Sequence, residues 1–468
     1  METVAVLVPV ALVEVVEGLS RLYEKVVSRA GARGLEEAVH AGLKASDALF
    51  MSACVREKAR QSVEDGGEGV VCSHSGEWAV SLDKERKRHM VTIRGHVDFR
   101  RSVYQCSRRE CRRERAPFDE EWGLESKGHF SPLVRKKAAW AGAMQTSYER
   151  ASQDMVGQAE IAMSAKQVQR ITERVADRAL ALEAEEVEHL GRPAAWDHVV
   201  EPAERPETLV LEMDGTCVMG RDGQGHDVKC ATVFGLDARA SSGSPGKERP
   251  MLLRRAYCAT TRGIQPFRAM VWALCVWWGI RSALRVAIVG DGADWIWNFS
   301  RERFHFVLAD GTVQAPIEIL DFYHAMEHLT GARDAIFGQG ESPPARRWYE
   351  TWRERVWEGD VASLIGELVK RSKRSCNEAS REELRGRAEY FRKHAARMRY
   401  PEYRALGLPI GSGAIEGTCK NLIKGRMSCV GQRWDANNGI ERMTALRVRI
   451  FNQRYDDLWK TPAERLAA

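Results

Sequence analysis

The sequence lacks the marks of an exported or membrane-spanning protein. Residues 1–18 are largely apolar, but no basic segment precedes them, and they contain Glu2, Glu14 and Glu17. Their longest uncharged run, residues 3–13, is much shorter than the roughly 20 apolar residues that cross a bilayer. We therefore expect a cytoplasmic protein with reduced thiols and no membrane partner.

The sequence also lacks a regular cysteine framework, because its 11 cysteines are scattered and odd in number. Residues 91–106 alternate apolar and polar side chains in two runs, which is typical of strands. Cys72 and His74 precede these runs, and Cys106 and Cys111 follow, as paired ligands do in a zinc ribbon. Neither pair has CxxC spacing. Two hypotheses therefore stay open: a Zn²⁺ site, or a ribbon without metal held by its small core.

There is little excess of charge of one sign, since the formal net charge is only +6. The charge is unevenly distributed, however. Residues 84–115 contain 12 Lys or Arg against 4 Asp or Glu, residues 417–455 contain 8 against 2, and residues 181–207 reverse the balance with 2 against 8. Basic clusters in a nearly neutral chain predict a polyanion partner, with solvated helix faces as the alternative.

Residues 147–175 have the spacing of a helix-turn-helix. Apolar side chains in the first part are followed by a turn at 157–161, and Ser164 and Gln167 then have the spacing of a capping box for a second helix. The apolar face of that helix would carry Val168, Ile171 and Val175. Its exposed face would offer side chains that contact bases and phosphates, namely Lys166, Gln169 and Arg170. A helical hairpin without a DNA-binding role is the alternative.

A chain of 468 residues is long enough for about three domains. After the acidic linker, strand-like and helical stretches alternate. Three strands come first, followed by helix, strand, helix and strand, which is the order of a ribonuclease H-like α/β fold. The predicted elements are strands at 208–214, 227–236 and 249–260, a helix at 263–280, a strand at 285–291, a helix at 292–304 and a strand at 315–321.

Residues 326–405 have a charged helical composition without strand signals, which predicts an all-helical insertion into this fold. The predicted segments are a helical module at 1–68, a zinc-ribbon-like β segment at 69–125, a helix-turn-helix region with linker at 126–205, the first part of the ribonuclease H-like core at 206–325, the insertion at 326–405, the final core helices at 406–455 and a tail at 456–468.

Three carboxylates lie where predicted strands end or a helix begins. Asp214 closes the apolar run TLVLEMD, Asp291 closes RVAIVGD, and Glu416 follows a Gly-Ser-Gly turn. Such side chains can converge although they are far apart in sequence, and converging carboxylates bind the Mg²⁺ pairs that serve in phosphodiester cleavage. The sequence thus predicts Asp214, Asp291 and Glu416 as ligands of two Mg²⁺ ions.

Each of these residues also has a structural alternative. Asp214 could belong to a turn, Asp291 could cap the following helix, and Glu416 could only stabilise a helix start. Asp321 and His324 form a DxxH pair. They are either a helix N-cap with a core histidine or an active-site pair that orients the substrate.

The string of motifs resembles the bacterial insertion-sequence transposases of the DDE class, close to the ISKra-four family. The resemblance covers roughly residues 70–455 and rests on MDGT, GDGADW, LDFYHAMEHL and PIGSGAIEG, followed by KGRM and GQRW, in that order. It identifies Asp214 and Asp291 with the family's first and second Asp, Glu416 with its Glu, and Asp321 and His324 with its DxxH signature. The cysteine knuckles match only in part, because Ser75 stands where CxxC would place the second Cys.

The resemblance implies a ribonuclease H-like catalytic core and Mg²⁺-dependent cutting of transposon ends, with joining of the 3′-hydroxyl to target DNA. We therefore expect DNA partners (terminal inverted repeats and target DNA), nucleoid association and a homo-oligomer in the active complex. A nuclease without strand transfer and a non-catalytic, domesticated DNA-binding protein stay as alternatives. Candidate DNA contacts near the site are Lys420, Lys424, Arg426, Arg433 and Trp434.

Overall fold

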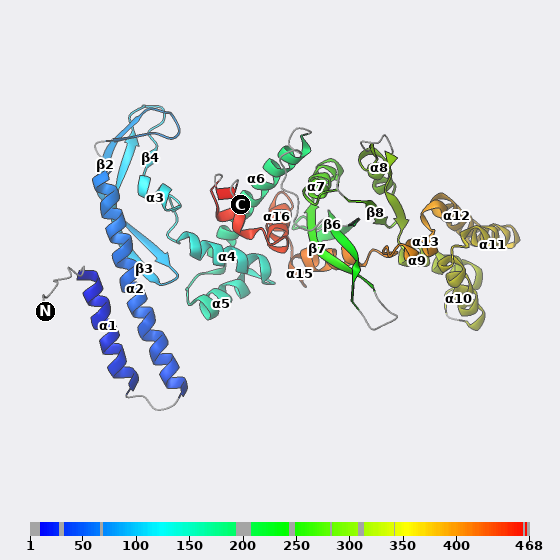
Figure 1. Ribbon diagram of the computed structural model, residues 1–468, viewed down its shortest axis with the longest axis horizontal. Coiled ribbons are helices and arrows are strands. Elements are labelled where there is room, and N and C mark those ends of the chain that lie inside the picture. Colours follow the sequence, from blue (N-terminus) through cyan, green and yellow to red (C-terminus); the bar gives the residue numbers. More distant parts are fainter. Residues whose placement is uncertain are drawn as a thin grey trace. The chain divides into compact units, whose positions relative to one another are not determined.

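A computed structural model of the chain describes residues 10–27, 32–65, 69–192, 207–242, 249–280, 283–307, 313–340, 342–461 and 464–465. The chain divides into two compact units, Met1–Thr172 and Glu173–Ala468, whose elements are labelled in Figure 1. The proline-containing part of the predicted linker, 193–206, lies outside the described residues. No helix within the described ranges is long and apolar enough to cross a membrane.

A four-stranded antiparallel sheet of order β1-β2-β3-β4 lies in the first unit. The prediction of strands in residues 91–106 is confirmed, because β2 and β3 form a hairpin whose register ends at the pair Thr92 and Gly95. The hairpin buries Met90, Val97 and Phe99 in a small core. The strands are β1 (Gly69–Val71), β2 (Trp78–Thr92), β3 (Gly95–Cys106) and β4 (Glu114–Arg115).

Helices make up the rest of the first unit. The capping box predicted at the start of the recognition helix is present, since Gln167 N–H donates to Ser164 Oγ at 3.3 Å and Ser164 N–H donates to Gln167 Oε1 at 2.8 Å. The preceding turn is closed by Glu160, whose φ of 54° is left-handed. The helices are α1 (Val10–Val27), α2 (Ala32–Asp65), α3 (Pro117–Glu121), α4 (Pro132–Met144), α5 (Tyr148–Ala159) and α6 (Ala165–Gly191), the last of which continues into the second unit.

The second unit is built on a mixed five-stranded sheet of order β11-β8-β5-β6-β7. The first three strands in sequence form an antiparallel meander, and β8 and β11 run parallel to β5. These strands and the two intervening helices are the elements that the sequence predicted. Their bounds are β5 (Thr208–Met219), β6 (Gly225–Ser242), β7 (Arg249–Thr260), α7 (Ile264–Trp277), β8 (Arg285–Gly290), α8 (Asp294–Arg303) and β11 (Ile317–Leu320).

Two features of this sheet differ from the prediction. β5 does not end at Asp214 but continues to Met219, because its antiparallel pairing with β6 extends well beyond its parallel pairing with β8. A short hairpin of β9 (Phe306–Val307) and β10 (Val313–Gln314) precedes β11, where the sequence had predicted no strands. Asp214 therefore lies inside β5, at the point where one parallel neighbour ends.

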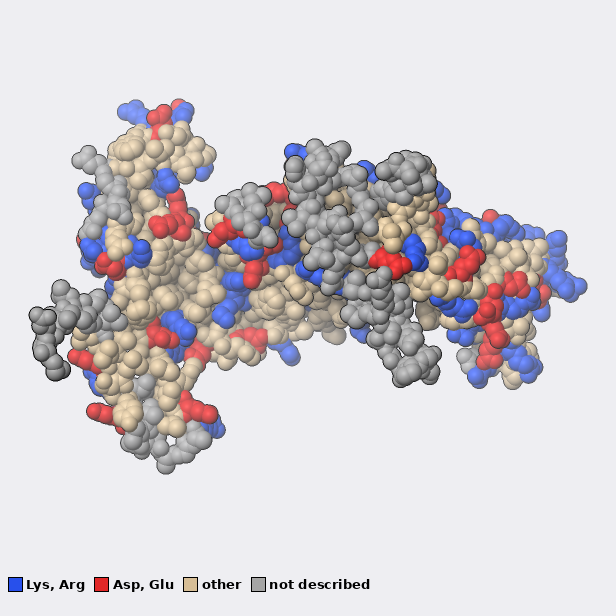
Figure 2. All heavy atoms as spheres, viewed as in Figure 1, with Lys and Arg blue, Asp and Glu red and all other residues tan. Residues whose placement is uncertain are grey.

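A block of helices lies between β11 and the last part of the chain, as predicted. Figure 2 shows Lys and Arg interspersed with Asp and Glu over this block, and many of these charges pair on their own helix, as Arg346 does with Glu350 at 2.9 Å. The face shown is therefore not of one sign. The block comprises α9 (Phe322–Phe337), α10 (Pro343–Trp357), α11 (Val361–Arg374), α12 (Glu378–His394), η2 (Ala395–Arg397) and α13 (Tyr400–Ala405).

The final segment returns to the sheet. Its first helix contacts β5 and β6, and its last long helix contacts β7. A π-helical stretch follows the first helix directly, a distortion that is frequent at functional sites. The elements are α14 (Gly413–Thr418), η3 (Cys419–Lys424), α15 (Gly425–Met427), α16 (Gly439–Phe451) and η4 (Tyr455–Trp459).

Candidate active site

Two of the predicted carboxylates lie beside each other at neighbouring parallel strands. The parallel register of β5 and β8 pairs Glu212 with Val289; two residues further on come Asp214, within β5, and Asp291, directly after the end of β8. Carboxyl ends of adjacent parallel strands face the same edge of a sheet, where ligands bind in open α/β folds. The fold thus brings together two acids that are distant in sequence.

The electrostatics of Asp214 show which groups surround it. Burial raises the pKa of Asp214 above its ordinary value, and the negative charge of Asp291 raises it further. The N–H of Gly215 and the positive charges of His324 and Lys424 act in the opposite direction. Asp214 therefore lies close to a second carboxylate and between a histidine and a lysine, an environment that a bound cation would relieve.

Asp291 is fixed by the turn that follows β8. Its Oδ1 accepts the N–H of Ala293 at 2.9 Å, which closes a turn before α8 and does not cap that helix, whose N-cap, Ala293, has no side-chain capping bond. Tyr390 of α12 donates its hydroxyl to the Asp291 carbonyl at 3.3 Å. Gly292 has a φ of 104°, and a Cβ there would lie 3.2 Å from the Tyr390 hydroxyl. The helical block therefore packs directly on this turn, which leaves room only for glycine.

Asp321 and His324 have different roles. Asp321 is buried at the N-cap of α9, where its carboxylate accepts the N–H of Tyr323 at 2.7 Å and that of His324 at 3.3 Å. The N-cap alternative is thus correct for Asp321. His324 is only half-buried and has its nearest anionic partner in Glu327 at 3.3 Å. The charge of His324 acts on Asp214, so the imidazole lies in the neighbourhood of that carboxylate.

Glu416 is exposed in the first turn of α14, the helix that contacts β5 and β6. Its carboxylate does not form a tight cluster with the two aspartates. Among the described residues, the group of three potential ligands whose atoms all lie within 4.8 Å of one another is formed by Cys72, Cys106 and Cys111. The oxygens of Asp214, Asp291 and Glu416 are therefore spread over a wider space than that.

The predicted DNA contacts near the site fall into two groups. Lys420, Lys424 and Arg433 are exposed, and Lys424 is the one whose charge reaches Asp214. Arg426 and Trp434 are buried, with the guanidinium carbon 4.8 Å from the centre of the indole ring. These two side chains face each other rather than solvent, because the backbone of Trp434 is bound to the end of β5 through Met219. Neither is available for DNA in this conformation.

A buried arginine also holds the π-helical stretch. Arg447 of α16 donates from Nε to the carbonyl of Leu422 and from Nη2 to that of Asn421, each at 2.6 Å. Burial lowers the pKa of Arg447 to about 10, and the neighbouring charge of Arg426 lowers it as well. The backbone of the π-helical stretch, which carries Lys420 and Lys424, is therefore held in place by the Arg447 side chain of α16.

The predicted recognition helix presents its polar residues as expected. Lys166 and Arg170 are exposed, Gln169 is half-buried, and Lys166 Nζ donates to Gln169 Oε1 at 3.1 Å. The opposite face is buried, through Val168, Ile171 and Val175.

The cysteine cluster lies at one end of the first unit's sheet and differs from the prediction in one ligand. Cys72 and Cys111 have their sulfurs 3.9 Å apart, and Ser75 Oγ lies 3.2 Å from Cys106 Sγ. His74 is exposed and outside the cluster. In a knuckle the third residue after the first ligand turns back towards the metal, so Ser75 takes that place. Hydrogen bonds, first of all from the Ser75 side chain, lower the pKa of Cys72 to about 6, which favours the thiolate.

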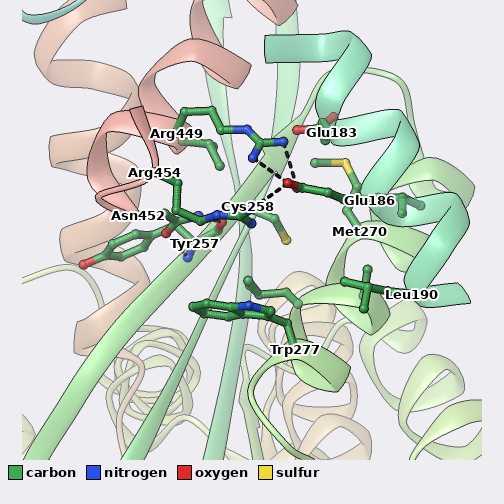
Figure 3. Close-up of a pocket in the computed structure, with 14 residues that line it drawn as sticks. Glu183, Glu186, Leu190, Tyr257, Cys258, Met270, Trp277, Arg449, Asn452 and Arg454 are labelled. Atoms are coloured by element: carbon green, nitrogen blue, oxygen red, sulfur yellow. Dashed lines mark hydrogen bonds and ion pairs between the residues drawn. The ribbon is translucent and has the colours of Figure 1, made fainter. Parts of the chain in front are cut away.

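A small cavity of about 70 Å³ lies in the second unit between α6, α7, β7 and the end of α16. Figure 3 shows its polar groups directed at one another, with Glu186 held by Arg449 at 2.7 Å and by Arg454 at 2.6 Å. None of the predicted site residues lines it. It is also smaller than the roughly 300 Å³ or more of ligand pockets. We regard it as a small gap in the packing between these elements and not as a ligand site.

Glu212 is the site residue that the sequence analysis missed. It is buried on β5, two residues before Asp214, and accepts the N–H of Ile415 at 2.8 Å. The pKa of Glu212 is raised to about 8, chiefly by burial and also by the charge of Asp321, although the N–H of Ile415 acts in the opposite direction. A lone glutamate in the apolar run TLVLEMD was the available signal.

Comparison with known proteins identifies no family. No family model and no curated protein matches the chain. Among solved structures, the Drosophila P element transposase strand transfer complex is similar at 12% sequence identity, with 71% of this chain and 81% of that chain covered and a TM-score of 0.22. A likeness of this degree supports no functional assignment.

Proposed function

We propose that the chain is a DNA transposase of the DDE class, of the kind that the ISKra-four resemblance implies. It would cut transposon ends and join the 3′-hydroxyl to target DNA by two-metal chemistry. The observation that carries this proposal is that Asp214, within β5, and Asp291, directly after the parallel strand β8, lie close enough for their charges to interact, with the helix of Glu416 packed on the same sheet.

The sheet topology supports a ribonuclease H-like core. That fold has an antiparallel meander of three strands followed by two strands parallel to the first, as the motif resemblance implies. In this chain the meander is β5-β6-β7, and β8 and β11 extend the sheet on the other side of β5. The helical block then enters between β11 and α14, where the sequence predicted an insertion.

The proposed role of the three carboxylates requires a pair of Mg²⁺ ions, as the motif resemblance implies. Oxygen ligands of a single octahedral Mg²⁺ lie at most about 4.2 Å apart, twice the usual bond length. Asp214, Asp291 and Glu416 do not all lie within 4.8 Å of one another. Asp214 would be shared, and Asp291 and Glu416 would each complete one side. When bound, two such ions stabilise the attacking and leaving oxygens of an in-line phosphoryl displacement.

The other groups would hold DNA. Lys424, whose charge acts on Asp214, would contact a phosphate near the cleavage position, and the exposed Lys420 and Arg433 would be further contacts to the DNA backbone. His324 would orient the substrate beside Asp214. Lys166, Gln169 and Arg170 would bind the terminal inverted repeats. A homo-oligomer would bring two transposon ends together.

We also propose that the first unit binds one Zn²⁺ through Cys72, Cys106 and Cys111. Three thiolates supply most of a tetrahedral structural site, and the Ser75 hydroxyl lies beside them at the fourth position. His74 is not part of this proposal.

The test uses duplexes made from the DNA that flanks the gene, where inverted repeats would supply the natural ends. Asp214→Asn and Asp291→Asn should each lower Mg²⁺-dependent cleavage by at least about 100-fold, because the charge that holds the metal is lost. DNA affinity should change little. Asp294→Asn is the matched control, since Asp294 is exposed beside the site and pairs with Lys393 at 2.6 Å.

The outcomes separate the alternatives. Cleavage at the wild-type rate in Asp214→Asn would refute the assignment. Cleavage without joined products, followed through a labelled 3′ end, would identify a nuclease on the same fold. DNA binding without any Mg²⁺-dependent cleavage would identify a non-catalytic DNA-binding protein.

A further inference from the structure

The helical segment that carries Glu416, formed by α14 and the π-helical stretch that follows it directly, has no side-chain cap at its start. α14 has six residues, and its N-cap, Ser412, makes no side-chain hydrogen bond to the helix. The N–H groups of a first helical turn have no partners within the helix, and they need acceptors from outside. Two carboxyl groups of other elements supply them.

The first carboxyl belongs to Glu212 of β5. Its Oε2 accepts the N–H of Ile415 at 2.8 Å, and the backbone of Ala414 also hydrogen-bonds to it. Side chains two residues apart on a strand face the same side. Glu212 thus faces the same side of β5 as Asp214, and Ile415 directly precedes Glu416 in the helix.

The second carboxyl belongs to Asp321. Its Oδ2 accepts the N–H of Ser412 at 3.1 Å and the Ser412 hydroxyl, while its Oδ1 caps α9. The preceding residue, Gly411, packs so closely that a Cβ there would lie 2.7 Å from the Tyr323 ring. The turn before α14 and the first turn of α14 are therefore each held by a buried acid.

We propose that Glu212 is a positioning residue, which acts with Asp321 to fix the start of α14 on β5 and so determines where the Glu416 carboxylate lies relative to Asp214. The metal-binding role of Glu416 rests on the proposed function. The anchoring of α14 does not, because it depends only on hydrogen bonds within the chain.

The proposal is tested with two substitutions of nearly equal volume. Glu212→Gln keeps a side-chain oxygen that accepts the N–H of Ile415, whereas Glu212→Met fills the space without an acceptor. Thr444→Val is the matched control, because Thr444 is buried on α16 and its hydroxyl bonds only within that helix. It reports general destabilisation of the second unit.

Amide hydrogen exchange of residues 412–416 is measured in the full chain without metal or DNA. In Glu212→Met it should accelerate by at least about tenfold, while Glu212→Gln stays within about threefold of wild type. In Glu212→Met, the exchange rates of the amides in β5 and β8 should be no higher than those in the control variant Thr444→Val. An unchanged rate at 412–416, or acceleration of the whole sheet to the same degree, would overturn the proposal.

A second experiment measures the affinity of the same variants for Mn²⁺. Glu212→Met should weaken Mn²⁺ binding by about 10–100-fold, and Glu212→Gln should restore most of it, as expected for a group that orients a ligand. Loss of affinity of equal size in both variants would contradict positioning through an acceptor. If wild type neither binds Mn²⁺ nor cuts DNA, the proposed function fails, and the exchange data alone decide the anchoring.

If Glu212→Met does not fold, Ser412→Ala replaces it. This substitution removes the hydroxyl that donates a hydrogen bond to the Asp321 carboxylate and leaves the backbone N–H of residue 412 in place. Faster exchange confined to residues 412–416 supports the anchoring of α14 by buried acids, and wild-type exchange there overturns it.

Discussion

Asp214 and Asp291 are two residues beyond a register pair of parallel strands, and the negative charge of Asp291 adds to burial in raising the pKa of Asp214. The positive charge of Lys424 offsets part of this repulsion at Asp214. The lysine lies on the π-helical stretch that Arg447 anchors. The pKa of Asp214 on β5 therefore depends on the turn after β8, on the π-helical stretch that carries Lys424, and indirectly on α16, which holds that stretch.

Lys424→Ala should make cleavage more sensitive to acid. Without this charge the pKa of Asp214 rises further, so the carboxylate is lost at a higher pH as the solution is acidified. The midpoint of the acid limb of the cleavage rate should move up by about 0.5–1 pH unit. Lys420→Ala, on the same element and exposed, is the control. An equal shift in both variants would contradict a specific effect on Asp214.

Ser75→Cys should strengthen zinc binding. The serine hydroxyl lies 3.2 Å from Cys106 Sγ, so a thiol at 75 would complete a four-cysteine site. We expect one Zn²⁺ per chain, retained at chelator concentrations that strip the wild-type protein. His74→Ala should leave zinc content as it is, since His74 lies outside the cluster. Loss of zinc in His74→Ala, or its retention after Cys72→Ser, would refute the assigned ligands.

Arg170→Ala and Lys166→Ala should weaken binding to the inverted repeats. Each exposed cation that contacts a phosphate adds to the salt dependence, so its loss should reduce the slope of log affinity against log salt by about 1. Arg385→Ala removes an exposed charge from α12 and is the control. Unchanged affinity and slope in both helix variants would assign α6 to packing only.

Glu183→Gln should remove a pH-dependent loss of stability. Burial raises the pKa of Glu183 to about 7, from 4.5 in an unperturbed carboxyl, although Arg262 opposes this shift. Between these values the folded chain keeps the proton that the unfolded chain has lost, so stability falls as pH rises from 4.5 to 7.

Over this pH range the free energy of unfolding of the wild-type chain should fall by on the order of 1–3 kcal/mol because of Glu183. Denaturant unfolding at pH 5 and pH 8 checks it, with a smaller difference between the two in Glu183→Gln than in wild type. Glu185→Gln, an exposed neighbour, should behave as wild type. The same pH dependence in wild type and Glu183→Gln would show that Glu183 is ionised in the folded state.

The five-stranded sheet was predictable because several of its strands contain apolar runs followed by an acid. RVAIVGD has the composition of a strand covered on both faces, and β8 is buried over almost its whole length. The end of β5 was not predictable, since its pairing with β6 beyond Asp214 depends on a polar turn and not on an apolar run. The capping box could be predicted because its two partners, Ser164 and Gln167, are close to each other in the sequence.

Long-range packing accounts for the remaining errors. A basic or aromatic residue near a site is equally compatible with DNA and with the interior, and Arg426 and Trp434 are buried against each other. The choice between His74 and Ser75 depends on the backbone turn, which residue type does not reveal. Glu212 was passed over because its partner, Ile415, is two hundred residues away in the chain.

The helical block leaves and rejoins the sheet at a single point. Phe322 N–H donates to the carbonyl of Ile410 at 2.8 Å, directly beside the Asp321 bonds to Ser412. With both ends of a loop tied together, each doubling of its length raises the closure entropy by only about 0.6 kcal/mol. The size of this block is therefore hardly limited by the closure of its ends, but by its apolar side chains, which share one core with the sheet and must stay covered.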